Sequence, residues 1–177
     1  DGGNSNYGTA IVGTVSGTAI TFGSAVVFNS GTAFQMGITF DSNVNKVVIG
    51  FRDGSNSNAG TGIVGTVSGT SISFGSEYVF STPCQYVAVT FDSNSNKVVF
   101  GYRHHTTDYA MAIVGTVSGT AISYGSEATA HSVNSSFNAL TFDSNSNKVV
   151  LTCRQATDGA GVAAVGTVSG TSISFGT

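Results

Sequence analysis

The chain has 177 residues, of which 40% are hydrophobic and only 8% are charged. This hydrophobic content excludes wholesale disorder and allows the core of one ordinary domain. A formal net charge of -3 with six Lys and Arg residues excludes the basic surface that nucleic-acid binding needs. No apolar run approaches the roughly 18 residues of a membrane span, so we expect no membrane insertion.

Two motifs recur along the chain. The hexapeptide Val-Gly-Thr-Val-Ser-Gly begins at Val12, Val64, Val114 and Val165. Between its copies, Thr-Phe-Asp-Ser-Asn-x-Asn-Lys-Val-Val occurs three times, with aspartates 51 residues apart at Asp41, Asp92 and Asp143. Such a period indicates a solenoid, a propeller or an array, because one unit alone cannot bury its own apolar faces.

Short runs of strand length fill the chain in a fixed order. After a polar loop at residues 1–8, residues 8–23 predict two strands joined at Ser16, Gly17 and Thr18. Residues 35–41 and 46–52 predict the next pair of strands. We denote the four successive strand positions of a unit A, B, C and D. They recur at 87–92, 97–103, 110–119 and 121–126, and again at 138–143, 148–154, 162–170 and 172–176. No window has helical spacing, so we expect an all-β protein.

Alternation within the strands indicates two unlike faces. In residues 46–52, Val47, Ile49 and Phe51 share one face, whereas Val48 and Gly50 share the other. One face is therefore bulky and the other shallow, and the same split recurs in the later units. We expect repeated four-stranded antiparallel sheets that pack the bulky face of one unit onto the shallow face of the next.

A unit of about 50 residues made of two successive hairpins resembles a blade of a kelch-type or tachylectin-like β-propeller. The segments VGTVSGTSISFG and TFDSNSNKVV are similar to repeat arrays of uncharacterised marine bacterial and phage surface or tail proteins. The resemblance implies a β-propeller-like fold of about 3.5 blades and an extracellular, cell-surface or virion location. A stacked-sheet solenoid and a β-trefoil remain alternatives. The expected division is one repeat domain with a half unit at 1–34 and units at 35–85, 86–136 and 137–177.

Each A–B turn carries an acid and a lysine. The simplest interpretation is a cross-strand ion pair between Asp41 and Lys46 at an exposed turn. The alternative is calcium, because alternate oxygen-bearing side chains resemble the start of an EF-hand loop. The candidate ligands are Asp41, Asn43, Asn45, Asp92, Asn94, Asn96, Asp143, Asn145 and Asn147. The turns lack the central Gly and the closing carboxylate, so the sequence favours the ion pair and no cofactor is expected.

The opposite end of strand B carries an arginine in every unit, followed by the loops that differ most between units. A constant framework with variable loops is typical of a binding surface on a rigid scaffold, although drift in unconstrained loops would look the same. Pairing of each arginine with an acid of its own loop is the alternative interpretation. The candidate ligand-binding residues are Arg52, Asn56, Asn58, Arg103, His104, His105, Asp108, Tyr109, Arg154 and Asp158.

No arrangement of nucleophile, base or paired carboxylates recurs, so we expect no enzymatic activity and no catalytic residue. His104, His105 and His131 are expected to face solvent without holding a metal, and Cys84 and Cys153 to be buried thiols. The sequence therefore predicts a non-enzymatic recognition or adhesion module for a glycan or a surface protein. The alternative is a structural filament or shell subunit.

The first half unit lacks strands A and B, which leaves its sheet incomplete. An unpaired strand and exposed apolar side chains such as Ile11, Val15, Ile20 and Phe22 invite another chain. We therefore expect self-association into a homo-oligomer or filament.

Overall fold

The computed structural model describes residues 3 and 5–176, so residues 1, 2 and 4 of the expected N-terminal loop, and residue 177, lie outside it. The described chain is built of β-strands without a helix, and it contains no helix that could cross a membrane. The first sheet has the order β1-β4-β5-β6-β7, with bounds Tyr7–Ala10, Val26–Asp41, Lys46–Asp53, Ala59–Ser68 and Ser71–Ser81.

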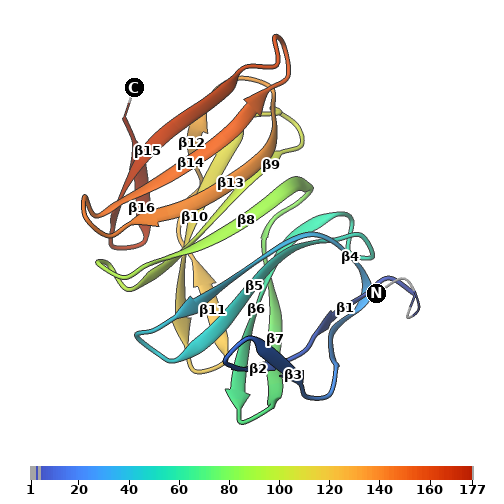
Figure 1. The fold of residues 1–177 in the computed structure, drawn as a ribbon. Helices are drawn as coiled ribbons and strands as arrows, with labels where there is room; N and C mark the ends of the chain where they lie inside the picture. The colour runs from blue at the N-terminus through green and yellow to red at the C-terminus, as the bar shows by residue number, and fades with distance from the viewer. Residues whose placement is uncertain (1–2, 4, 177) are drawn as a thin grey trace.

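The later sheets follow towards the other end of the molecule (Figure 1). The second runs β11-β10-β9-β8, with β12 also paired to β10, and its strands are Cys84–Asp92, Lys97–His104, Ala110–Ser118, Ala121–Tyr124 and Ala128–His131 for β8 to β12. The third runs β13-β14-β15-β16, over Ser135–Asp143, Lys148–Gln155, Gly161–Ser169 and Ser172–Phe175. A small hairpin pairs β2 (Gly13–Ser16) with β3 (Ala19–Phe22). All these pairings are antiparallel, which confirms the all-β fold.

Strand β4 differs from the expected short strand at residues 35–41. It is one strand of 16 residues that pairs with β1 over its first part and with β5 over its second. The expected boundary between residues 34 and 35 falls inside it, so β1 and the first part of β4 belong to the sheet of the first full unit, whereas the β2–β3 hairpin forms a sheet of its own. Phe28 anchors this strand, because its ring packs against Phe51 and Phe74 with centroids 5.3 and 5.6 Å apart.

Packing between units follows the two unlike faces of the strands. Gly50, on the shallow face of β5, lies so close to Phe100 of β9 that an added Cβ would stand 2.8 Å from the ring. Val48 belongs to the same buried cluster as Phe100, and Val99 belongs to the next cluster with Leu151. The expected packing of bulky face onto shallow face is therefore confirmed at successive junctions.

A second contact between neighbouring units lies near the C–D turn. Gly125, just after β11, lies against the backbone carbonyl of Thr171 in the next unit, and a Cβ on Gly125 would overlap that oxygen. The backbone of Gly125 does not have a positive φ. Glycine is needed there for close approach of two backbones rather than for its conformation.

We predict that Gly125→Ala lowers the free energy of unfolding by about 1–3 kcal/mol, because the turn at Thr171 must move away. Urea denaturation followed by circular dichroism measures the change. Gly161→Ala is the matched control, since an added Cβ there meets nothing within 4 Å. Equal stability of the two variants would contradict the proposed packing.

Candidate functional site

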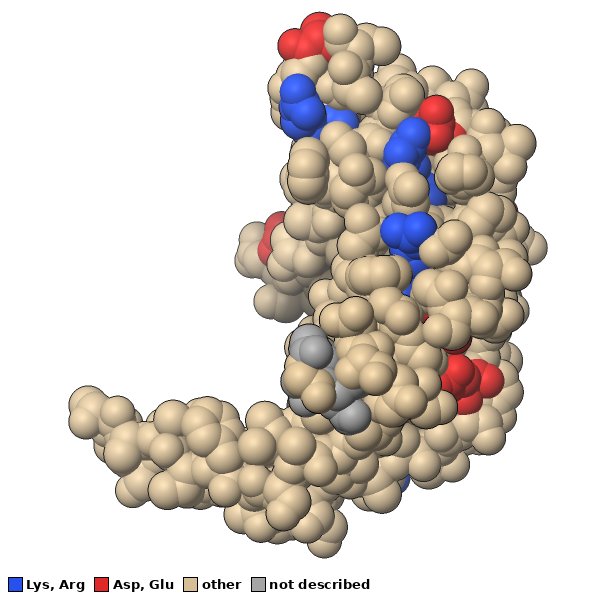
Figure 2. Space-filling model, turned by 90° about the vertical axis from the view of Figure 1, so that its right-hand side faces the viewer, with Lys and Arg blue, Asp and Glu red and all other residues tan. Residues whose placement is uncertain are grey.

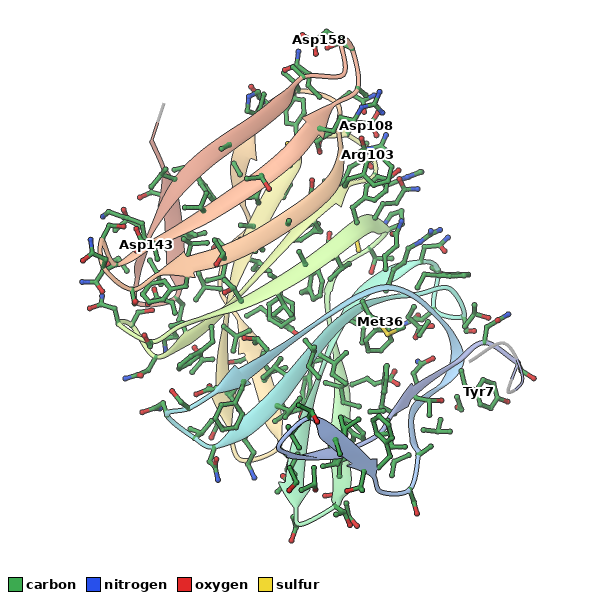
Figure 3. The ribbon with its side chains drawn as sticks, in the orientation of Figure 1. Tyr7, Met36, Arg103, Asp108, Asp143 and Asp158 are labelled. Carbon is green, nitrogen blue, oxygen red and sulfur yellow. The ribbon has the colours of Figure 1, made fainter. Side chains whose placement is uncertain are left out.

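The arginine-bearing ends of the B strands and their loops lie along one edge of the molecule. Figure 3 shows Arg103, Asp108 and Asp158 on this edge, and Asp143 of an A–B turn on the opposite one. Cationic patches form a column on the face drawn in Figure 2. The structure therefore places the variable loops on a common edge, as expected.

The first arginine fixes its own loop. Arg52 Nη2 donates to Asn58 Oδ1 at 2.6 Å, and its guanidinium lies 5.5 Å from the centre of the Phe34 ring. The adjacent Asp53 does not pair with it; its Oδ1 accepts the backbone N–H groups of Ser55 and Asn56. Arg52 therefore stabilises the turn through an amide rather than through the expected acid.

The second arginine forms the ion pair that the sequence suggests. Arg103 Nη2 pairs with Asp108 Oδ1, and its Nη1 donates to Gln85 Oε1 at 2.6 Å. The Asp108 carbonyl also accepts the backbone N–H of Ser135 at 2.9 Å. These contacts join the loop of the second unit to β8 and to the start of the third sheet, so this loop is held in place from several sides.

The third arginine is exposed and does not pair with Asp158. Asp158 Oδ1 instead accepts the backbone N–H of Ala160 at 3.0 Å. Pairing between arginine and loop acid is therefore found in the second unit and not in the first or third. The loops use their acids mainly to stabilise turns.

The A–B turns use their aspartates in the same way. Asp41 Oδ1 accepts the N–H groups of Asn43 and Val44, and Asp92 and Asp143 do the same in their turns. The last asparagine of each turn has a positive φ of 55–57°, in Asn45, Asn96 and Asn147. The repeated oxygen spacing thus has a role in turn geometry, and no cluster of His, Cys, Asp or Glu among the described residues could hold a metal.

The expected ion pair between Asp41 and Lys46 is not formed, although the two residues are cross-strand partners. Lys46 Nζ donates to Thr66 Oγ1 at 2.8 Å instead. Lys148 makes the same bond to Thr167 at 2.9 Å. These two lysines therefore link strand B to strand C of their own units, whereas the equivalent hydroxyl of the second unit, Thr116 Oγ1, is buried without a hydrogen-bond partner in the described chain.

The second unit has a hollow beside its B–C loop. Its volume is about 260 Å³, and its lining residues are His104, Thr107, Tyr109, Met111, Glu127 and Thr129. The loop is closed by hydrogen bonds from His104 N–H to Tyr109 O at 3.0 Å and from Asp108 N–H to His104 O at 2.8 Å. The hollow therefore has a fixed wall from the loop and a second wall from β12 and the residues before it.

Glu127, in the lining of this hollow, accepts a hydrogen bond from a buried tyrosine. Tyr102 Oη donates to Glu127 Oε1 at 2.5 Å, and Tyr102 itself is fully buried. Burial, followed by the bond to Glu127, raises the pKa of Tyr102 above its ordinary value. The hydroxyl therefore stays protonated and orients the carboxylate of Glu127.

The structure brings together some of the expected binding residues and separates others. His104 and Tyr109 line the hollow, while Arg103 and Asp108 fix the loop beside it. The remaining exposed candidates take no part in it: Asn56, His105, Arg154 and Asp158. Sequence reasoning missed Glu127, although the Gly-Ser-Glu triplet shared by residues 75–77 and 125–127 could have indicated it.

The histidines do not all face solvent as expected. His105 is exposed, but His104 and His131 are half-buried. His131 Nδ1 is buried and makes no hydrogen bond within the described part of the chain. His131 lies in a separate hollow against β15 and β16, so it does not contribute to the site with His104.

Both cysteines are free and buried, as expected. Burial raises the pKa of the Cys84 thiol from 9.0 to about 12, partly offset by the positive charge of Arg52. Burial also raises the pKa of Cys153. Cys84 is a cross-strand partner of His104, so this thiol lies under the loop of the candidate site.

Comparisons with protein-family models, curated protein sequences and solved structures found no match.

We predict that Cys84 does not react with a thiol reagent at pH 8 until the chain unfolds. Cys153→Ser provides a background in which Cys84 is the one remaining thiol, and spectrophotometric labelling with and without urea measures its reactivity. Rapid labelling of the folded protein would contradict the burial of Cys84.

The same thiol also predicts a dependence of stability on pH. The unfolded thiol ionises near pH 9, whereas the folded thiol stays protonated to about pH 12. Its contribution to stability is complete below pH 9 and is lost between pH 9 and 12, by about 1.4 kcal/mol per pH unit. Urea denaturation across this range, compared with Cys84→Ala, measures the slope; equal slopes would contradict the prediction.

Proposed function

We propose that this chain is a non-enzymatic recognition module that acts outside the cell or on a virion and binds a carbohydrate in the hollow of its second unit. The observation that carries the proposal is the hollow lined by His104, Tyr109 and Glu127 on the variable-loop edge. A concave site with a few convergent polar groups and an aromatic side chain is the usual form of a small-ligand site.

The lining residues suit a sugar ring. Tyr109 supplies an aromatic surface for the C–H face of a pyranose, and Met111 supplies an apolar, adaptable contact. Glu127, oriented by Tyr102, accepts hydrogen bonds from sugar hydroxyl groups. The carboxylate disfavours an acidic sugar by like-charge repulsion, so a neutral or amino sugar is the expected ligand.

The hollow belongs to one unit of the repeat, which supports a specific role. The position of His104 is taken by Asp53 in the first unit, where the acid stabilises a turn. Glu77, the counterpart of Glu127, accepts a hydrogen bond from Asn29 at 3.0 Å. The repeated framework thus supplies a rigid support, and the second unit departs from it at the residues that would meet a ligand.

The proposed scaffold is a propeller-like stack in which each four-stranded unit is a blade. The repeated A–B–C–D order of the second and third sheets and the bulky-onto-shallow packing support this interpretation. In such a stack the B–C loops of successive blades share one rim, which is suited to displaying variable loops.

A glycan array followed by calorimetric titration of the best ligand tests the proposed function. We predict that Tyr109→Ala and Glu127→Gln each weaken binding by roughly tenfold or more. Glu77→Gln is the matched control, because its amide oxygen can still accept the bond from Asn29, and it should bind like the wild-type protein.

Absence of glycan binding, or binding that both Tyr109→Ala and Glu127→Gln leave unchanged, would contradict the carbohydrate site. Binding of a surface protein that these variants weaken would support recognition at the same hollow with a different ligand. If all variants bound normally, the hollow would have no part in recognition.

A further inference from the structure

The junction between units contains one backbone contact that recurs along the chain. A glycine of each unit, directly after β3, within β7 or directly after β11, lies against the backbone carbonyl of the threonine in the C–D turn of the next unit. The three pairs are Gly23 with Thr70, Gly75 with Thr120, and Gly125 with Thr171. In each pair an added Cβ would overlap the carbonyl oxygen, so the two backbones meet in the same way at every junction.

Each end of the described structure presents one half of this contact. Gly176 occupies the fourth glycine position, and the atom nearest to an added Cβ there is Val165 O of its own unit, at 3.9 Å. Thr18 occupies the first threonine position, in the turn between β2 and β3, and is exposed. These two halves lie at opposite ends of the molecule, β2 and β3 at the lower end and β16 at the upper end of Figure 1.

The apolar residues around Thr18 are more exposed than their counterparts in the later units. Ile20 is 51% exposed, whereas Ile72, Ile122 and Ile173 are 8%, 2% and 5% exposed. Val15 is 71% exposed, compared with 44% for Val67 and 9% for Val117 at the same position. The bulky face of the β2–β3 hairpin is thus a junction surface without its neighbour.

The other end shows the complementary change on the shallow face. Val165 is 48% exposed, whereas Val64 and Val114 at the same position are fully buried. Residues 11–25 and 161–176 contain no charged side chain, so no charge opposes their approach. The shallow face of β15 and β16 is therefore not covered by a bulky face, and the bulky face of the β2–β3 hairpin does not pack on a shallow face.

We propose that a second copy of this chain fills each end, with the β2–β3 hairpin of one copy seated on β15 and β16 of the next. Gly176 of one copy then meets Thr18 of the other, as the three pairs within the chain meet. The two surfaces differ, so the contact is head-to-tail and extends into a filament unless the rotation between copies closes a ring. This inference does not depend on the ligand of the hollow in the second unit.

The proposed contact between copies involves only C and D strands. It is therefore a different interface from one formed through strand β4. Met36, Ile38 and Phe40 of β4 are also exposed, at 49%, 65% and 51%. Met36 and Ile38 line a hollow together with Thr9 and Ala10 of β1. Association through these residues would be a different interface, and Ile38→Asp distinguishes the two.

Two end-blocked variants test the proposal. Ile20→Asp places a charge on the bulky end, and Val165→Asp places one on the shallow end; both positions are exposed in the single chain, so the fold should be retained. Circular dichroism and thermal melting check that it is. Should Val165→Asp not fold, Gly176→Val blocks the same end.

Sedimentation velocity gives the readout. We expect the wild-type protein to associate in a concentration-dependent manner. Ile20→Asp alone and Val165→Asp alone should each sediment as the 17.9 kDa monomer. An equimolar mixture of the two variants should form a dimer and nothing larger. The unblocked shallow end of Ile20→Asp pairs with the unblocked bulky end of Val165→Asp, and both outer ends of the resulting dimer carry the blocking aspartate. Ile38→Asp should associate like the wild-type protein.

A wild-type protein that stays monomeric at high micromolar concentration would overturn the proposal. So would self-association of either blocked variant at the wild-type level, a mixture that remains monomeric, or loss of association in Ile38→Asp. Glu127→Gln should associate like the wild-type protein even if it no longer binds a glycan. The test of association is therefore independent of the test of carbohydrate binding in the hollow.

Discussion

The packing of a bulky sheet face onto a shallow, glycine-bearing face is the contact on which the rest of the structure depends. Gly50 accommodates Phe100, and Gly101 accommodates Leu140 and Leu151 in the same manner. Each junction buries large side chains that a single four-stranded sheet would leave in water. Because charged residues are only 8% of the chain, burial at these junctions rather than ion pairing stabilises the fold.

The strands of the second and third sheets other than β12, the A–B turns and the two unlike faces could be predicted from the sequence, because a repeated period-2 pattern is a strong local signal. The continuity of β4 could not be predicted in this way. It depends on Phe28, which is held by Phe51 and Phe74 across the sheet, and on Asn29, which bonds to Asp53 and Glu77. These are long-range contacts, and the segment Asn29–Thr32 taken alone has the composition of a turn.

The candidate site was predicted only in part, for a related reason. The sequence indicated the loop that carries His104 and Tyr109, because this loop differs from those of the other units. The opposite wall comes from Glu127 and Thr129, at and before β12, where strand D was expected to have ended at Ser126. Tyr102 occupies the position that Phe51 has on the bulky face of the first unit. Its hydroxyl orients Glu127, a contact between residues 25 positions apart that spacing does not reveal.

Native-state hydrogen exchange on the dilute chain tests most directly whether the junctions stabilise this fold. We predict the slowest exchange in β9 and β10, which have a neighbouring unit on both faces, and fast exchange in the exposed β2–β3 hairpin. Protection of β2 and β3 equal to that of β9 in the monomer would contradict it. Stability would then reside within each hairpin rather than at the junctions between units.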